Sequence, residues 1–80
     1  MPRFYFHIRE SDILKEDRVG LDLPSVEAAL IEAEHGARGF VAEAVETGRG
    51  VDHQQFEVTD DSGTLLLVYP FSSVIRRTPD

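Results

Sequence analysis

One long stripe of apolar residues most constrains what this chain can fold into. Its members lie three or four positions apart: Val26, Ala29, Leu30, Ala33, Ala37, Phe40, Val41 and Ala44. The spacing predicts an amphipathic helix, because residues three and four apart share one helix face. Ser25 is a suitable N-cap before the stripe, and Gly48 is a suitable residue to end the helix. In a chain of 80 residues, a helix this long leaves room for only one domain.

Two segments before the helix and two after it have the sequence patterns of strands. In the first, Phe4, Phe6 and Ile8 alternate with polar residues and are expected to face the core. The last is a nearly continuous apolar run, separated from the one before it by the turn-forming residues 60–63. The four expected strands are residues 3–9, 13–16, 54–59 and 64–69.

The order of these elements predicts an α+β fold of the ββαββ type. One amphipathic helix would pack on a four-stranded, mainly antiparallel sheet, which gives two layers. Two strand orders remain open. The order 2-1-3-4 makes every neighbour antiparallel, whereas 2-1-4-3 places the first and last strands side by side and parallel, which suits an apolar run covered on both faces.

The single domain is expected to span residues 1–80. Phe71, Ser72, Val74 and Ile75 indicate one more helical turn laid against the core. The core is expected within residues 3–75, followed by a polar tail at residues 76–80 that frays.

One helix covers only one face of a four-stranded sheet, so the other face should be open. We place on this face Tyr5 and His7 from the first strand, Gln55 and Glu57 from the third, and Leu65, Leu67 and Tyr69 from the fourth. Exposed apolar patches on soluble proteins usually mark contact sites. We therefore expect a non-enzymatic module that self-associates, or docks on a protein partner, through the open face or an edge strand. A homodimer is the simplest case.

Two other functions are weaker interpretations of the same face. An enzyme could pair His7 with Glu57 for acid–base work, assisted by Tyr5, but a flat sheet offers little pocket, and we assign no catalytic residue. A single-strand nucleic-acid binder could stack bases on Tyr5 and Tyr69. The formal net charge of −7 opposes that function, because such affinity comes largely from cationic groups.

Several chemistries have no support in the sequence. The chain contains no cysteine, which removes disulfides and thiolate zinc sites. His7, His35 and His53 do not have the spacing of metal ligands, so we expect no metal, no cofactor and no small-molecule ligand. There is no apolar run long enough to span a bilayer and no signal-peptide pattern at the N-terminus, so we expect no membrane partner and a cytoplasmic location.

Gly36 and Gly39 interrupt an otherwise good helix sequence. Each costs roughly 1 kcal/mol relative to alanine inside a helix. Simple tolerance of the two residues is one interpretation. Close approach of the helix backbone to the sheet or to a second subunit is the other.

Three motifs occur in order along the chain. They are Met1-Pro2-Arg3-Phe4-Tyr5-Phe6-His7, Leu23-Pro24 before the Ala- and Glu-rich helix, and the stretch from Glu57-Val58-Thr59-Asp60 to Tyr69-Pro70-Phe71. In these motifs the chain resembles a domain-of-unknown-function family of short proteins found mostly in rhizobia and related alphaproteobacteria. Its members look like M-P-R-[YF]-[YF]-F-H, then L-P-x-x-E-A-A into the helix, then a strand that ends in P-F. The resemblance implies a stand-alone bacterial cytoplasmic protein of the ββαββ kind and supplies no activity, ligand or catalytic residue.

Overall fold

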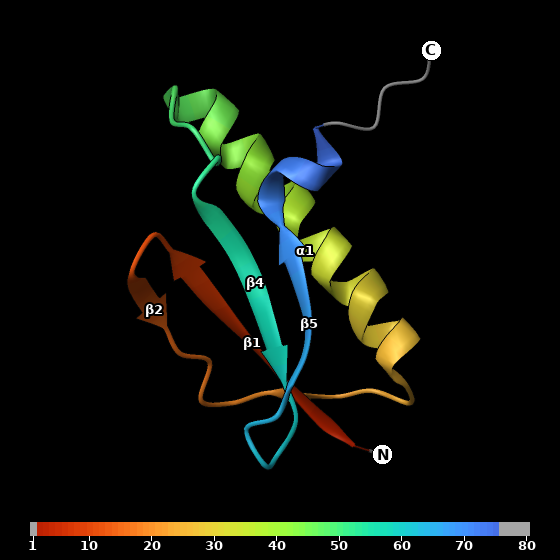
Figure 1. The fold of residues 1–80 in the computed structure, drawn as a ribbon. Helices are drawn as coiled ribbons and strands as arrows, with labels where there is room; N and C mark the ends of the chain where they lie inside the picture. Colours follow the sequence, from red (N-terminus) through yellow and green to blue (C-terminus); the bar gives the residue numbers. More distant parts are fainter. Residues whose placement is uncertain (1, 76–80) are drawn as a thin grey trace.

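The computed structural model describes residues 2–75, and the predicted polar tail at 76–80 lies outside them. The longer strands and the helix follow one another in the predicted order (Figure 1). The structure has one additional short strand. In chain order they are β1 (Arg3–Glu10), β2 (Ile13–Lys15), β3 (Leu21–Asp22), α1 (Val26–Thr47), β4 (Gln54–Thr59), β5 (Leu65–Pro70) and the 3-10 turn η1 (Phe71–Val74). The α+β class predicted from the sequence is therefore confirmed.

The sheet has five strands rather than the four expected. Its order is β2-β1-β4-β5, and β3 pairs with the start of β1 on the same edge as β2. Every pair is antiparallel, which confirms the order 2-1-3-4 for the expected strands and shows that the order with a parallel centre is wrong. The extra strand arises because the segment before the helix runs back along β1, where Arg3 pairs with Asp22.

The helix begins and ends at the residues that the sequence predicts. The Ser25 side chain accepts a hydrogen bond from the backbone N–H of Ala28 at 3.1 Å, as an N-cap should. Gly48 takes the left-handed conformation with φ 75°, and its N–H reaches the carbonyl oxygens of Ala44 and Val45. The helix packs against β4, β5 and η1 and lies across one face of the sheet (Figure 1).

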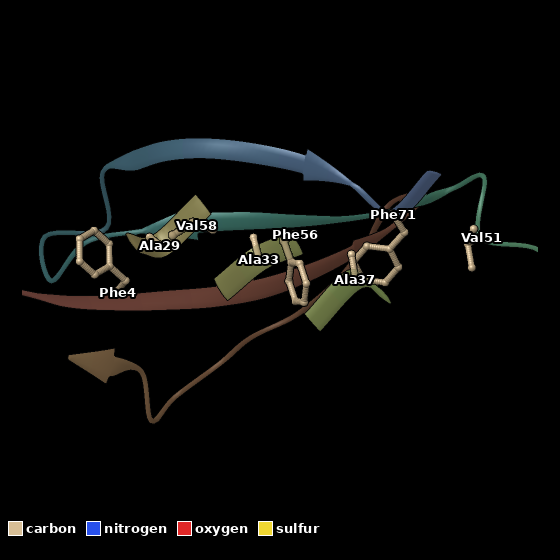
Figure 2. Packing of buried hydrophobic residues seen from close by; sticks show 8 residues of the cluster. All are labelled: Phe4, Ala29, Ala33, Ala37, Val51, Phe56, Val58 and Phe71. Atoms are coloured by element: carbon tan, nitrogen blue, oxygen red, sulfur yellow. The ribbon is translucent and has the colours of Figure 1, made fainter. Parts of the chain in front are cut away.

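The core lies between this helix and the sheet. Its buried residues come from both layers and from the turns that join them: Phe4, Ala29, Ala33, Ala37, Val51, Phe56, Val58 and Phe71 (Figure 2). The three helix residues among them are alanines, whose small side chains let the helix approach the strands closely. Phe71 is fully buried and stacks on Phe40 with ring centroids 5.2 Å apart. The expected last helical turn is therefore part of the core.

The two helix glycines have different surroundings. A Cβ atom at Gly36 would lie 3.0 Å from the ring of Phe56, so this glycine lets the helix pass close to the sheet. A Cβ atom at Gly39 would meet no other atom within 4 Å. Close approach to the sheet therefore explains Gly36 alone.

Candidate functional site

The strand register defines which residues share the sheet face that α1 leaves uncovered, here called the open face. In antiparallel pairs, directly opposite residues project to the same side of the sheet. Tyr5 lies opposite Thr59, and His7 lies opposite Glu57. Arg9 lies opposite Gln55 in the same register. Their neighbours Phe4, Phe6, Ile8, Phe56 and Val58 belong to the core or pack against it. The register therefore places four of the expected residues on the open face: Tyr5, His7, Gln55 and Glu57.

Two of the expected open-face residues lie on the other side of the sheet. Leu67 is opposite Val58 and Tyr69 is opposite Phe56, and both pack against the buried cluster next to α1. The prediction for Leu67 and Tyr69 is therefore wrong, because an apolar run has no alternation from which its facing could be read. Leu65 is opposite Thr59 and 54% exposed, which agrees with the predicted side.

A shift in register explains why alternate leucines of β5 do not share one face. Between Val58 and Thr59 the pairing with β5 moves by one residue, so that Leu66 is the extra residue of a bulge. The apolar residue of β5 that faces the open side in the regular part of the strand is Val68, opposite Glu57.

His7 is held by hydrogen bonds at both ring nitrogens. The backbone N–H of Asp17 donates to Nδ1 at 3.0 Å, and Nε2 lies 3.0 Å from Oγ1 of Thr59. Because a backbone N–H can only donate, Nδ1 accepts and Nε2 carries the proton in this arrangement. The ring of Tyr5 stacks beside that of His7, with centroids 6.4 Å apart. The His7 ring therefore connects β1 to the segment at Asp17 and to Thr59 at the end of β4.

Glu57 belongs to a second group of polar contacts on the same face. Arg9 donates to both of its carboxylate oxygens, from Nε at 3.0 Å and from Nη2 at 3.4 Å. Gln55 donates to Glu57 at 3.0 Å. The hydrogen bond from Arg9, together with that from Gln55, outweighs burial and lowers the pKa of Glu57 below its ordinary value.

These contacts bear on the acid–base interpretation of the open face. His7 and Glu57 are neighbours, but His7 bonds to Asp17 and Thr59, while Glu57 bonds to Arg9 and Gln55. The Tyr5 hydroxyl donates instead to Asp61 at 3.1 Å. A shallow hollow of about 420 Å³ at the end of the sheet is lined by Arg9 and Glu57, but not by Tyr5 or His7. The geometry gives the three residues separate structural partners rather than a shared reaction centre.

One edge of the sheet is closed by a side chain that the sequence analysis did not single out. Between β2 and β3, the N–H of Phe6 has no strand partner and donates to Oδ2 of Asp17 at 3.0 Å. The other carboxylate oxygen accepts from Val19 at 3.0 Å and from Gly20 at 3.1 Å. Burial opposes ionisation of Asp17, but these three N–H groups outweigh it and lower its pKa.

The sequence around Asp17 contains a turn pattern from which this contact could have been predicted. An aspartate followed three residues later by glycine is typical of a turn in which the side chain accepts backbone N–H groups. Gly20 has φ 77°, as a turn of this kind favours. The edge beyond β1 is thus occupied by two short strands and one charged side chain.

The opposite edge of the sheet is formed by β5. The strand order ends there, and within residues 2–75 no strand pairs with its outer side. The strand has six residues, Leu-Leu-Leu-Val-Tyr-Pro, and none of them is charged. Leu65 is 54% exposed and Val68 is 44% exposed. In the described part of the chain, this edge therefore presents backbone groups without a strand partner, between apolar side chains.

Other kinds of site find no support in the described part of the chain. Among residues 2–75, no three histidine, aspartate or glutamate side chains lie close enough together to hold a metal ion. Within the same residues, α1 is not apolar enough to cross a bilayer.

Within residues 2–75, the fold and its edges define a two-layer α+β domain with one sheet face that α1 leaves uncovered and one edge strand, β5, without charged residues. The chain belongs to the family described as a domain of unknown function, DUF6894, whose model matches residues 3–72. The match runs from the first residue of β1 into η1 and so includes α1 and all five strands. It confirms membership of an uncharacterised family, while the motif pattern and the bacterial origin stay predictions. No curated protein and no solved structure matches the chain.

Proposed function

We propose that this protein is a self-association module, in which a second copy of the chain adds a strand to the free edge of β5. The observation that carries the proposal is the contrast between the two edges of the sheet. Native proteins protect sheet edges with short strands, charged side chains, prolines, bulges or covering elements. Of these, β5 has a bulge at Leu66 and Pro70 at its end, but no charge, and it is not short. The edge beyond β1 has such protection in its two short strands and in Asp17. The six-residue strand β5 carries no charge.

The composition of β5 favours a second copy over a charged peptide as the occupant. Strand addition draws its affinity from backbone hydrogen bonds, and the side chains of the added strand decide which partner fits. The strand offers apolar residues on both faces, so the partner that matches it is another apolar strand. The same strand on a second copy meets that requirement. In a symmetric dimer, the same surface of both copies forms the interface.

The open face supports the proposal less well than the edge does. The register places polar side chains along its centre, and Arg9, Glu57 and Gln55 already satisfy one another there. The exposed apolar residues of this face lie at its two rims, Leu65 and Val68 in β5 and the less exposed Leu14 in β2. A pairing at the edge would cover the rim at β5 and leave the polar centre in water.

Sedimentation equilibrium of three chains tests the proposal. The unmodified chain should be a dimer at high micromolar concentration, and Val68→Lys should be monomeric because it places a charge in the paired strand. Val19→Lys is the matched control, since Val19 is 74% exposed and lies between β2 and β3 at the protected edge. This control should dimerise like the unmodified chain. A monomeric unmodified chain would overturn the proposal.

The salt dependence of the association gives a second test of the same surface. Each chain has a formal net charge of −7, so two copies repel one another at long range. Salt screens that repulsion, and the apolar edge contains no ion pairs for salt to weaken. Dimerisation should therefore strengthen as salt is added. Weakening by salt would indicate a partner surface held by charge, at odds with pairing through β5.

A further inference from the structure

The direction of the backbone groups on β5 follows from one hydrogen bond on the far side of the sheet. The N–H of Phe6 donates to Asp17 at the edge beyond β1, so it points away from β4. In an antiparallel strand, the N–H and C=O of one residue point to the same side, and those of the next residue point to the other. Phe6 and Val58 are therefore a pair without mutual hydrogen bonds, and the backbone groups of Val58 point to β5.

The same alternation continues into β5. Val58 lies opposite Leu67 and Phe56 opposite Tyr69, so these residues of β5 direct their backbone groups inward, to β4. Val68, between them, directs its N–H and C=O outward, to the free edge. Pro70 lies on the same outward side but has no N–H to donate. Val68 is thus the residue of the regular part of β5 that offers both a donor and an acceptor to an incoming strand.

We infer that two copies pair β5 with β5 in antiparallel orientation about a twofold axis at Val68, which joins their sheets into one continuous sheet. This inference rests on the proposed function and specifies its geometry. A residue on such an axis faces its own copy, so Val68 and the partner's Val68 would exchange two backbone hydrogen bonds. A residue with both groups directed outward is what a pair of this kind requires.

The side chains agree with this register. Leu67 would lie opposite the partner's Tyr69, on the side of the sheet that carries α1. Leu66 would lie opposite the partner's Pro70, on the open face. Every contact across the axis therefore joins two apolar residues, with no buried charge. The missing N–H of Pro70 ends the ladder, so the pairing stays within residues 66–70.

The neighbouring axis at Leu67 suits the strand less well. That register would place Leu66 opposite the partner's Val68 and would need regular backbone groups at Leu66. Leu66 is the extra residue at the shift in register between β4 and β5, where a strand bends and its ladder is locally disrupted. The axis at Val68 instead places its central pair of hydrogen bonds at Val68, in the half of β5 that continues regularly to Pro70, and reaches Leu66 only at the end of the pairing.

Single-cysteine variants test this register cleanly, because the chain has no cysteine of its own. Val68→Cys should form a covalent dimer readily on mild oxidation. Opposite residues of a hydrogen-bonded pair have Cα atoms about 5.5 Å apart, within the usual reach of a disulfide. In Leu66→Cys, the two thiols would lie roughly 13 Å apart along the strands and should not link. Val19→Cys gives the background rate of disulfide formation between copies that meet by random collision. Circular dichroism confirms that each variant is folded.

The expected result is cross-linking of Val68→Cys at least tenfold faster than that of Leu66→Cys and Val19→Cys. A faster reaction of Leu66→Cys, or of Leu67→Cys, would overturn the axis at Val68. This failure differs from failure of the proposed function. If the unmodified chain dimerises and Val68→Lys does not, but Val68→Cys fails to link, only the register is wrong. If the unmodified chain is monomeric, pairing through β5 is itself wrong.

Discussion

The carboxylate of Asp17 accepts the hydrogen bond that a neighbouring strand would otherwise accept from Phe6. Its Oδ2 lies 3.0 Å from the backbone nitrogen of Phe6, in the gap between β2 and β3. The backbone N–H of Asp17 in turn donates to His7 at 3.0 Å. Asp17 thus connects the edge of β1 to the polar group on the open face. The edge beyond β1 is protected by this residue, whereas no strand pairs with the outer side of β5 within residues 2–75.

Asp17→Ala is expected to lower the free energy of unfolding by about 2 kcal/mol, because the N–H groups of Phe6, Val19 and Gly20 lose their acceptor. Urea unfolding measures the loss. Asp17→Asn keeps one acceptor oxygen and should lose less. An alanine variant as stable as the unmodified chain would show that these contacts contribute nothing to the fold.

Acidification should destabilise the protein through Asp17 and Glu57. Both carboxyl groups have folded-state pKa values below their ordinary values of 3.8 and 4.5. A group of this kind contributes stability above its ordinary pKa, and the contribution is lost as the pH falls through the lowered pKa of the folded state. The free energy of unfolding should therefore decrease below about pH 4.5. The double variant Asp17→Asn, Glu57→Gln should decrease less over the same range. Equal decreases in the two proteins would contradict the role of these carboxylates.

The helix glycines form a matched pair for mutation. Gly39→Ala should raise the free energy of unfolding by roughly 1 kcal/mol, because its Cβ meets open space and alanine favours the helix. Gly36→Ala should lack this gain, because its Cβ would press on the ring of Phe56 at 3.0 Å. Thermal or urea unfolding compares them directly. Equal stabilisation by both substitutions would mean that Gly36 is not a site of close packing.

Removing the ring of Phe71 should have the largest effect on stability. Phe71 is fully buried and packs against Phe56, with ring centroids 4.9 Å apart. Phe71→Ala should therefore lose about 3–5 kcal/mol, and Phe71→Leu should lose less. Ile75→Ala, a residue 54% exposed just beyond η1, should change the stability little. A small loss in Phe71→Ala would place η1 outside the cooperative core.

The sequence predicts most of the fold because its patterns are local. The apolar stripe that starts at Val26 has the period of a helix, and Ser25 and Gly48 cap it as expected. Alternation in β1 and β4 likewise assigns His7 and Glu57 to the open face. Each of these predictions needs only the spacing of residues along the chain.

The candidate site was harder to predict because it depends on pairing between distant segments. The run of apolar residues in β5 carries no alternation, so its facing is decided by the register with β4, including the shift at Thr59. The strand order likewise depends on which of two possible neighbours β1 accepts. Asp17 is 11 residues from Phe6, and only the folded sheet shows that its side chain fills an edge.

Amide hydrogen exchange of Val68, measured by NMR across a range of protein concentrations, tests the pairing of β5 most directly. The Val68 N–H faces the free edge, so it should exchange fast in dilute solution and slow markedly as the concentration rises. The Leu67 N–H, directed to β4, is an internal reference that should be protected throughout. Fast exchange of Val68 at every concentration, or protection already present in the dilute monomer, would contradict the account.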